Sequence, residues 1–217
     1  MTADELLALY RREMRDVETP YLVEDADLYT YMADAQKWFC RLTEGIEDSR
    51  TDKVTLLSLT AAEDWYQLSP LVLKVRAVRR ASTGEPVRVV DDEDTDVEGI
   101  RFDGRTGPVR AVVTGRDRNA VRMWPVPDAT EDLRLTVFRL PLRDPSDSYP
   151  KLEIREEHHL ALLDWMKHKV YSIPDAELYD RNRASEHELK FRTYCAQARK
   201  EQGRLRHAAG TVRYGGL

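Results

Sequence analysis

Histidines and carboxylates gather near residue 160, where they could bind a metal ion or act as general bases. The histidines are His158, His159 and His168, and the nearby carboxylates are Glu156, Glu157 and Asp164. Zinc ligands on one helix must share a face, as in His-Glu-x-x-His, whereas His158 and His159 are adjacent and point in different directions. We therefore expect polar histidines on a helix surface and no metal site. A hydrolase that uses His158, His159 and Asp164 is a third hypothesis for the function.

An acidic run at residues 91–98, D-D-E-D-T-D-V-E, has the composition of a calcium-binding loop. It lacks the glycine at the sixth position and the terminal bidentate glutamate of an EF-hand, so we expect a solvated loop between strands. The chain also contains no Gly-x-Ser-x-Gly nucleophile motif and no glycine-rich phosphate loop. These observations predict that the protein is not an enzyme and that it uses no cofactor.

Basic side chains concentrate towards the C-terminus, where residues 181–213 carry nine Lys or Arg against three Glu. Clustered arginines neutralise phosphates, so a nucleic-acid-binding protein that uses this Arg-rich helix is the alternative hypothesis. The formal net charge of -5 and the isoelectric point of about 5.6 argue against it. The arginines also alternate with an apolar stripe, which indicates either a solvated helix face or a surface that docks against protein.

The composition is that of a folded globular chain, with 217 residues of which 41% are hydrophobic and 34% charged. Cys40 and Cys195 fall within helical apolar patterns, so we expect buried thiols in a reducing compartment. The N-terminus is acidic and amphipathic, unlike a signal peptide, and no apolar run approaches the roughly 20 residues that span a membrane. We expect a protein that is made and kept in a cytoplasm, with no membrane partner.

Two amphipathic helices open the chain. Thr2 and Glu5 form the capping box T-A-D-E ahead of apolar residues at helical spacing, which predicts a first helix that ends near Val17. The second helix is expected to have Asp25 as its N-cap and Gly45 as its C-cap. Apolar side chains recur every three or four residues between these two caps, on one side of the helix.

The hydrophobic period then changes from 3.6 to 2, which indicates short strands. We expect them at residues 54–59, 65–68, 73–78, 87–90, 100–102, 109–113, 120–124 and 133–137. The segment G-R-D-R-N at 115–119 has hairpin-turn chemistry, and Pro141, Pro145 and Pro150 mark a closing loop. The middle of the chain is therefore predicted to be a small antiparallel β module.

Two further helices follow the β module. Leu162, Met166 and Val170 share one face of the first helix, and Pro174 marks its end. From Asp175 an apolar pattern resumes, which predicts one helix of about eight turns. Its face comprises Ala176, Tyr179, Ala184, His187, Phe191, Tyr194, Cys195, Ala198, Gln202 and Leu205. The tail at 208–217 is either disordered or an arm that becomes ordered on a partner.

The element order predicts an α+β fold, in which N- and C-terminal helices form one bundle and a small antiparallel β module is inserted between them. No internal repeat or low-complexity tract interrupts this order. The expected parts are residues 1–48 for the N-terminal helices, 49–150 for the β module with its loops, 151–207 for the C-terminal helices and 208–217 for an extended arm.

This arrangement resembles the head-to-tail adaptor, or connector, proteins of short-tailed bacteriophages, such as tail tubular protein A. The segments that carry the resemblance are the opening Leu-Tyr helix, L-Y-T-Y-M-A-D-A-Q-K-W-F at 28–39, T-L-L-S-L-T at 55–60, E-E-H-H-L-A-L-L-D-W-M at 156–166, and the long helix with Phe191, Tyr194 and Cys195. None of them is a catalytic signature, so the resemblance concerns architecture and extends over almost the whole chain. The β module is larger than in the smaller, all-helical adaptors.

The resemblance implies a structural protein at the head-tail interface of a virion, assembled in the host cytoplasm. Such adaptors form a homo-oligomeric ring, usually a dodecamer, between the portal protein and a tail protein (the nozzle or tail tubular protein). DNA passes through the ring without sequence-specific binding, and a net acidic wall suits that passage because it does not bind phosphates. The C-terminal segment would bind the portal, through Arg199, Arg204, Arg206, Val212, Arg213, Tyr214 and Leu217.

Overall fold

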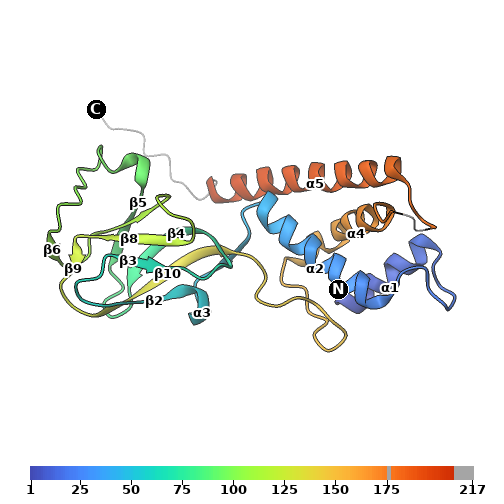
Figure 1. Cartoon of the computed structure of the whole chain (residues 1–217), viewed down its shortest axis with the longest axis horizontal. Helices are drawn as coiled ribbons and strands as arrows, with labels where there is room; N and C mark the ends of the chain where they lie inside the picture. The colour runs from blue at the N-terminus through green and yellow to red at the C-terminus, as the bar shows by residue number, and fades with distance from the viewer. Residues whose placement is uncertain (175–176, 208–217) are drawn as a thin grey trace. The chain divides into compact units, whose positions relative to one another are not determined.

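The computed structural model describes residues 1–174 and 177–207, with side chains described as far as Arg204. The chain divides into two compact units (Figure 1). The helical unit comprises Met1–Glu44 together with the chain from Pro141 onward, and the β unit comprises Gly45–Leu140. The predicted α+β class is confirmed, since N- and C-terminal helices pack together and the strands lie between them in the sequence.

The helical unit is built around contacts between helices from both ends of the chain. Its helical elements, over the described residues, are α1 (Ala3–Met14), α2 (Asp25–Leu42), the 3-10 helix η2 (Glu156–Ala161), α4 (Leu162–Tyr171) and α5 (Arg181–His207). α1 packs against α2, α4 packs against both α2 and α5, and α5 also contacts α2 (Figure 1). The core contains fully buried side chains from three of these helices, namely Leu28, Met32, Leu162, Met166 and Phe191.

The capping box at the start of α1 is confirmed. The Thr2 hydroxyl accepts a hydrogen bond from the Glu5 amide at 3.2 Å, and the Glu5 carboxylate accepts one from the Thr2 amide at 2.9 Å. These two bonds satisfy amides at the first turn that have no partner within the helix. The helix ends at Met14, three residues earlier than Val17, because Arg15 adopts a left-handed conformation with a φ of 57°.

Both predicted caps of α2 were wrong. Glu24 is the N-cap, and the Asp25 carboxylate instead accepts a hydrogen bond from the Arg11 guanidinium at 3.1 Å. Thr43 is the C-cap, whereas Gly45 belongs to the β unit. Gly45 has a φ of +80°, and a Cβ atom there would lie 2.9 Å from the Arg139 carbonyl oxygen, so the glycine permits a close contact between backbone segments.

The long C-terminal helix is confirmed, although it begins later than predicted. The Asp180 carboxylate accepts hydrogen bonds from the amides of Asn182 and Arg183, both at 3.0 Å, and thereby caps a helix that starts at Arg181 instead of Asp175. Tyr179 was wrongly assigned to the helical face, since it precedes the helix and is exposed. The buried side of α5 carries Ala184, Phe191, Cys195 and Ala198, as expected.

The β unit is a curled sheet organised around its last strand. Its strands are β1 (Ile46–Asp48), β2 (Leu56–Leu59), β3 (Trp65–Gln67), β4 (Val72–Arg80), β5 (Pro86–Asp91), β7 (Ala111–Thr114), β8 (Ala120–Trp124) and β10 (Glu131–Arg139). The order across the sheet is β1-β10-β4-β5-β7-β8-β3, and β2 also pairs with β10. A separate pair joins β6 (Thr106–Gly107) to β9 (Val126–Pro127).

The antiparallel prediction holds for the three partners of β10 and for the hairpin of β7 and β8, but not throughout. β5 and β7 are parallel, as are β6 and β9. The chain between β5 and β7 passes through the 3-10 helix η1 (Asp92–Asp94) and β6, so it returns to the sheet in its original direction. The sheet is therefore mixed.

Two predicted strand segments have other structures. Asp52–Thr55 forms a short helix, α3, so the strand expected from residue 54 begins only at Leu56. Residues 100–102 form no strand, but Ile100 is buried in a small apolar cluster with Val90 and Val113. The apolar character of this segment thus reflects a buried loop.

Candidate interaction surfaces

A row of buried side chains holds α5 against the rest of the helical unit. Phe191, Cys195 and Ala198 are buried at helical spacing, and the Phe191 ring centroid lies 5.1 Å from that of Trp165 in α4. Burial raises the pKa of the Cys195 thiol to about 12, so the thiol remains protonated at neutral pH and contributes by packing. The opposite side of α5 faces solvent.

Ion pairs are unevenly distributed over the exposed side of α5. In its first half, Lys190 pairs with Glu186 at 2.7 Å and Arg192 pairs with Glu188 at 2.8 Å. Three exposed basic residues towards its C-terminal end form no ion pair with another described residue, and these are Arg199, Lys200 and Arg204. Positive charge therefore accumulates at the end of α5.

The predicted portal-binding residues are only partly described by the structure. Arg199 and Arg204 are exposed on α5 and lie just over one helical turn apart. Arg206 belongs to α5 but its side chain lies outside the described residues, as do all the remaining predicted positions, Val212, Arg213, Tyr214 and Leu217. Their assignment to portal binding stays a prediction.

The prediction of surface histidines near residue 160 was wrong, because His158 and His159 are 5% and 4% exposed. The His158 Nδ1 atom lies 3.0 Å from the Tyr194 hydroxyl, and the His159 Nε2 atom lies 3.0 Å from the Ile154 carbonyl oxygen. The His158 ring also packs against Phe39, with centroids 4.7 Å apart. Burial lowers the pKa of His158, so its ring is neutral at pH 7.

Two other histidine contacts join α4 to α5. The His187 Nδ1 atom lies 2.8 Å from the Asp164 carboxylate, and the His168 Nδ1 atom lies 3.0 Å from the Ala184 carbonyl oxygen. Over the ranges that the structure describes, no three His, Cys, Asp or Glu side chains are placed to hold a metal ion. The contacts assign these histidines a structural role, which is to position α5.

The acidic run is an exposed loop, as predicted. Asp92–Asp94, near its start, forms η1, and most of its side chains are exposed to solvent. Arg88 pairs with Glu98, and Arg116 lies 3.8 Å from the Asp92 carboxylate, so part of its charge is compensated within the β unit.

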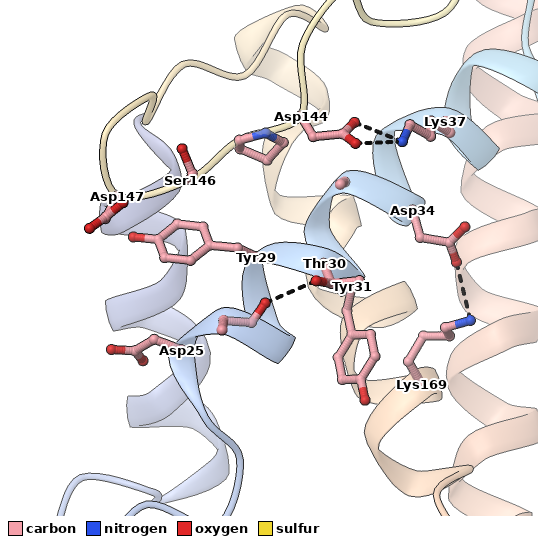
Figure 2. Close-up of a pocket in the computed structure, with 13 residues that line it drawn as sticks. Asp25, Tyr29, Thr30, Tyr31, Asp34, Lys37, Asp144, Ser146, Asp147 and Lys169 are labelled. Carbon is pink, nitrogen blue, oxygen red and sulfur yellow. Dashed lines mark hydrogen bonds and ion pairs between the residues drawn. The ribbon is translucent and has the colours of Figure 1, made fainter.

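A groove of about 780 Å³ lies alongside α2 in the helical unit (Figure 2). Its lining comes from α2, from the loop at 144–147 and from Lys169 of α4. The Tyr29 ring extends between Asp25 and Asp147, and its hydroxyl donates a hydrogen bond to Asp4 at 2.6 Å. Partial burial and these three carboxylates raise the pKa of Tyr29. The groove therefore has an aromatic wall surrounded by negative charge.

Four carboxylates and two lysines line this groove, which leaves it negative. Lys37 pairs with Asp144 at 2.7 Å, Lys169 pairs with Asp34 at 3.3 Å and Asp25 pairs with Arg11, whereas Asp147 forms no ion pair with a described residue. Sequence reasoning missed the groove. Asp25 and Tyr29 are one helical turn apart, but only the fold brings the loop at 144–147, over a hundred residues later, to the same side of α2.

Comparisons with known proteins identify one family. The family model described as SU10 adaptor protein matches residues 1–214 of the chain. A search of curated proteins found no match. Among the described residues, no helix combines the length and the apolar character that crossing a membrane requires.

Proposed function

Because the chain belongs to the SU10 adaptor protein family, a family of phage head-tail adaptors, we propose that it forms a ring that joins the portal protein of the capsid to the first tail protein. Its role is structural and not catalytic. DNA leaves the capsid through the opening of the ring. The protein thus resides at the head-tail interface of the virion, after assembly in the host cytoplasm.

The single observation that best supports a portal contact is the charge at the end of α5. Arg199, Lys200 and Arg204 are exposed without an ion-pair partner in the described chain, and they immediately precede the last residues of the sequence. Arginine and tyrosine are common anchors of protein interfaces, and residues 208–217 add both types. We assign portal binding to this end of α5 together with residues 208–217.

Deleting residues 208–217 tests this assignment. The truncated protein should lose binding to portal rings, observed as the absence of an added tier in negative-stain images, while its far-UV circular dichroism stays that of the full chain. The substitution Arg118→Ala, in the exposed turn of the β unit, serves as a control and should leave portal binding intact. Full portal binding by the truncated protein would disprove the role of this segment.

The overall charge fits passage of DNA through the ring. A formal net charge of -5 gives the subunit an acidic character, and an acidic channel wall repels phosphates and lets DNA slide. The β unit, which is larger than in the smaller, all-helical adaptors, is assigned to the contact with the tail protein.

Nucleic-acid binding is the second candidate function, and the unpaired basic end of α5 is the observation that favours it. It requires an affinity for duplex DNA that falls steeply as salt concentration rises. A fluorescence anisotropy titration at 50 mM salt decides between the two functions. Tight binding that Lys200→Glu and Arg204→Glu abolish would favour the second function, and no binding at this salt concentration would exclude it.

A further inference from the structure

We propose that neighbouring copies of this chain contact each other through the basic face of α5 on one copy and the acidic groove along α2 on the next. The inference rests on the proposed function, since a ring requires a contact between copies. The inference specifies which two surfaces of neighbouring copies are in contact and gives a physical reason for their fit.

The exposed face of α5 has the features of a docking helix. Leu189, Ala196 and Gly203 recur every seven residues, so they lie in one row along the helix. Leu189 is 66% exposed although it is apolar, and a Cβ atom at Gly203 would meet nothing within 4 Å. Glycine destabilises a helix, and no contact inside the described chain accounts for one here.

Basic side chains flank this row. Arg199 lies on one side of it, and Lys200 and Arg204 lie on the other, all without ion-pair partners in the described chain. A partner of this face must therefore carry carboxylates at its rim and accept small or apolar side chains at its centre.

The groove along α2 meets both requirements. It has four carboxylates against two lysines, and of these Asp147 is the one with no ion-pair partner among the described residues. Its remaining lining includes the rings of Tyr29 and Tyr31 and the small side chains of Ala26 and Ala33 (Figure 2). The groove is thus acidic at its edges and partly apolar within.

The two surfaces also match in length. Asp25 to Lys37 spans about 18 Å along α2, and Leu189 to Arg204 spans about 22 Å along α5, at 1.5 Å per helical residue. The loop that contributes Asp144 and Asp147 could therefore contact the basic end of α5 while Leu189 lies over the groove.

The position of the two surfaces within the helical unit favours a ring. In Figure 1, α5 runs along one edge of this unit and the loop after residue 141, drawn in gold, lies at the opposite edge. Because the two surfaces differ and lie apart, one copy cannot satisfy both with a single neighbour. Such heterologous contacts repeat from copy to copy and close into a ring when the rotation permits.

Charge reversal of each surface tests the contact. The groove variant carries Asp144→Lys and Asp147→Lys, and the helix variant carries Lys200→Glu and Arg204→Glu, all at exposed positions. A control variant, Arg101→Glu with Arg118→Glu, makes the same charge change as the helix variant at exposed sites of the β unit. Unchanged circular dichroism and thermal melting would show that each variant folds.

The readout is the number of copies bound to portal rings, measured by native mass spectrometry. In a ring made of one variant, the α5 face of each copy would meet a groove of the same charge on the next copy. We therefore expect at least about tenfold fewer complete rings than with the wild-type chain. An equimolar mixture of the two variants restores opposite charge at every contact and should return complete rings, whereas the control should behave as wild type.

Two results would overturn the inference. Complete rings from either variant alone would show that the reversed charges do not meet. A mixture that fails to recover would leave Lys200 and Arg204 to the portal contact alone and would show that the two surfaces are not partners. In both cases wild-type rings on the portal leave the proposed function standing. Portal rings left bare by the wild-type chain would instead overturn the proposed function and, with it, this inference.

Discussion

The two units use their charged side chains differently. In the β unit, arginines on neighbouring elements pair with carboxylates of the same unit, as Arg122 does with Asp64 at 2.7 Å and Arg134 with Asp52 at 2.5 Å, while charges without an ion-pair partner, such as Arg118, lie in exposed turns. In the helical unit, Arg199 on α5 and Asp147 beside the groove have no such partner among the described residues, and they lie on the two surfaces where we place contacts with other subunits.

The interiors of the units share one feature and differ in another. Each unit buries a charged pair, in which Arg139 donates a hydrogen bond to Asp48 at 2.7 Å in the β unit and Arg11 donates one to Asp16 at 2.6 Å in the helical unit. The helical unit also buries the neutral ring of His158, between Tyr194 and Phe39, whereas residues 45–140 contain no histidine. An imidazole that must stay uncharged adds a sensitivity to mild acid, so the two units should respond differently to a fall in pH.

The largest expected effect on stability comes from breaking the buried Arg139–Asp48 pair of the β unit. Burial alone would raise the pKa of Asp48, but hydrogen bonds from the amides of Arg50 and Thr51 and from Arg139 outweigh it and lower the pKa. Asp48→Asn removes one charged member of this buried ion pair and should destabilise the β unit by about 3–5 kcal/mol. The loss is measured as the change in the free energy of unfolding in urea. Hydrogen exchange of the amides in β4 and β10 reports the unfolding of the β unit.

The matched control for that substitution is Glu47→Gln, which removes the partner of Arg76 at the surface. Its effect should stay below about 1 kcal/mol, because exposed ion pairs contribute little. Equal effects of the two substitutions would contradict the importance assigned to burial.

A fall in pH should destabilise the two units over different pH ranges. The pKa of His158 is lowered in the fold, so below its ordinary value of 6.5 the unfolded chain binds a proton that the folded chain does not. The helical unit should therefore lose stability as pH falls below about 6.5. The lowered pKa of Asp48 acts in the same direction but at lower pH, so its contribution persists until pH falls below its ordinary value of 3.8.

Hydrogen exchange between pH 7 and pH 5 checks this difference, with protection falling in α4 and α5 before β10. In a His158→Gln variant the decline of the helical unit over this range should be smaller, because the titrating ring is gone. If hydrogen-exchange protection falls first in the β unit, His158 is not the group that makes the helical unit sensitive to acid.

The smallest effect on stability is expected for the surface charges of α5. Lys200→Ala and Arg204→Ala should each change the free energy of unfolding by no more than about 0.5 kcal/mol, because neither side chain has a partner inside the described chain. Thermal melting measures this value. A larger loss would mean that these residues stabilise the fold instead of binding a partner, which would remove the contrast between the units.

Local signals in the sequence were sufficient for elements that depend on nearby residues. The capping box of Thr2 and Glu5 and the apolar face of α5 involve residues within one or two helical turns, and both were predicted correctly. The start of α5 was missed because Asp180, which caps the helix, lies within a pattern that still looks helical by hydrophobicity.

Features that depend on distant residues were not predictable. The burial of His158 results from contacts with Phe39 and Tyr194, which are more than 30 residues away on either side. The groove and the parallel pairing of β5 with β7 likewise require the chain path, which hydrophobic periodicity does not encode. Sequence patterns therefore predicted the elements and the fold class, whereas the surfaces became visible only in the structure.

The place of β10 in the sequence has a consequence for synthesis of the chain. β1, β2 and β4 all pair with this strand, which is the last of the β unit to leave the ribosome. These three pairs therefore cannot form before residue 139 is translated, and α2 gains its contacts with α4 and α5 later still. During translation the side of α2 that packs against α4 and α5 stays uncovered while the intervening 96-residue β unit is made, so nascent chains require protection from aggregation during that interval.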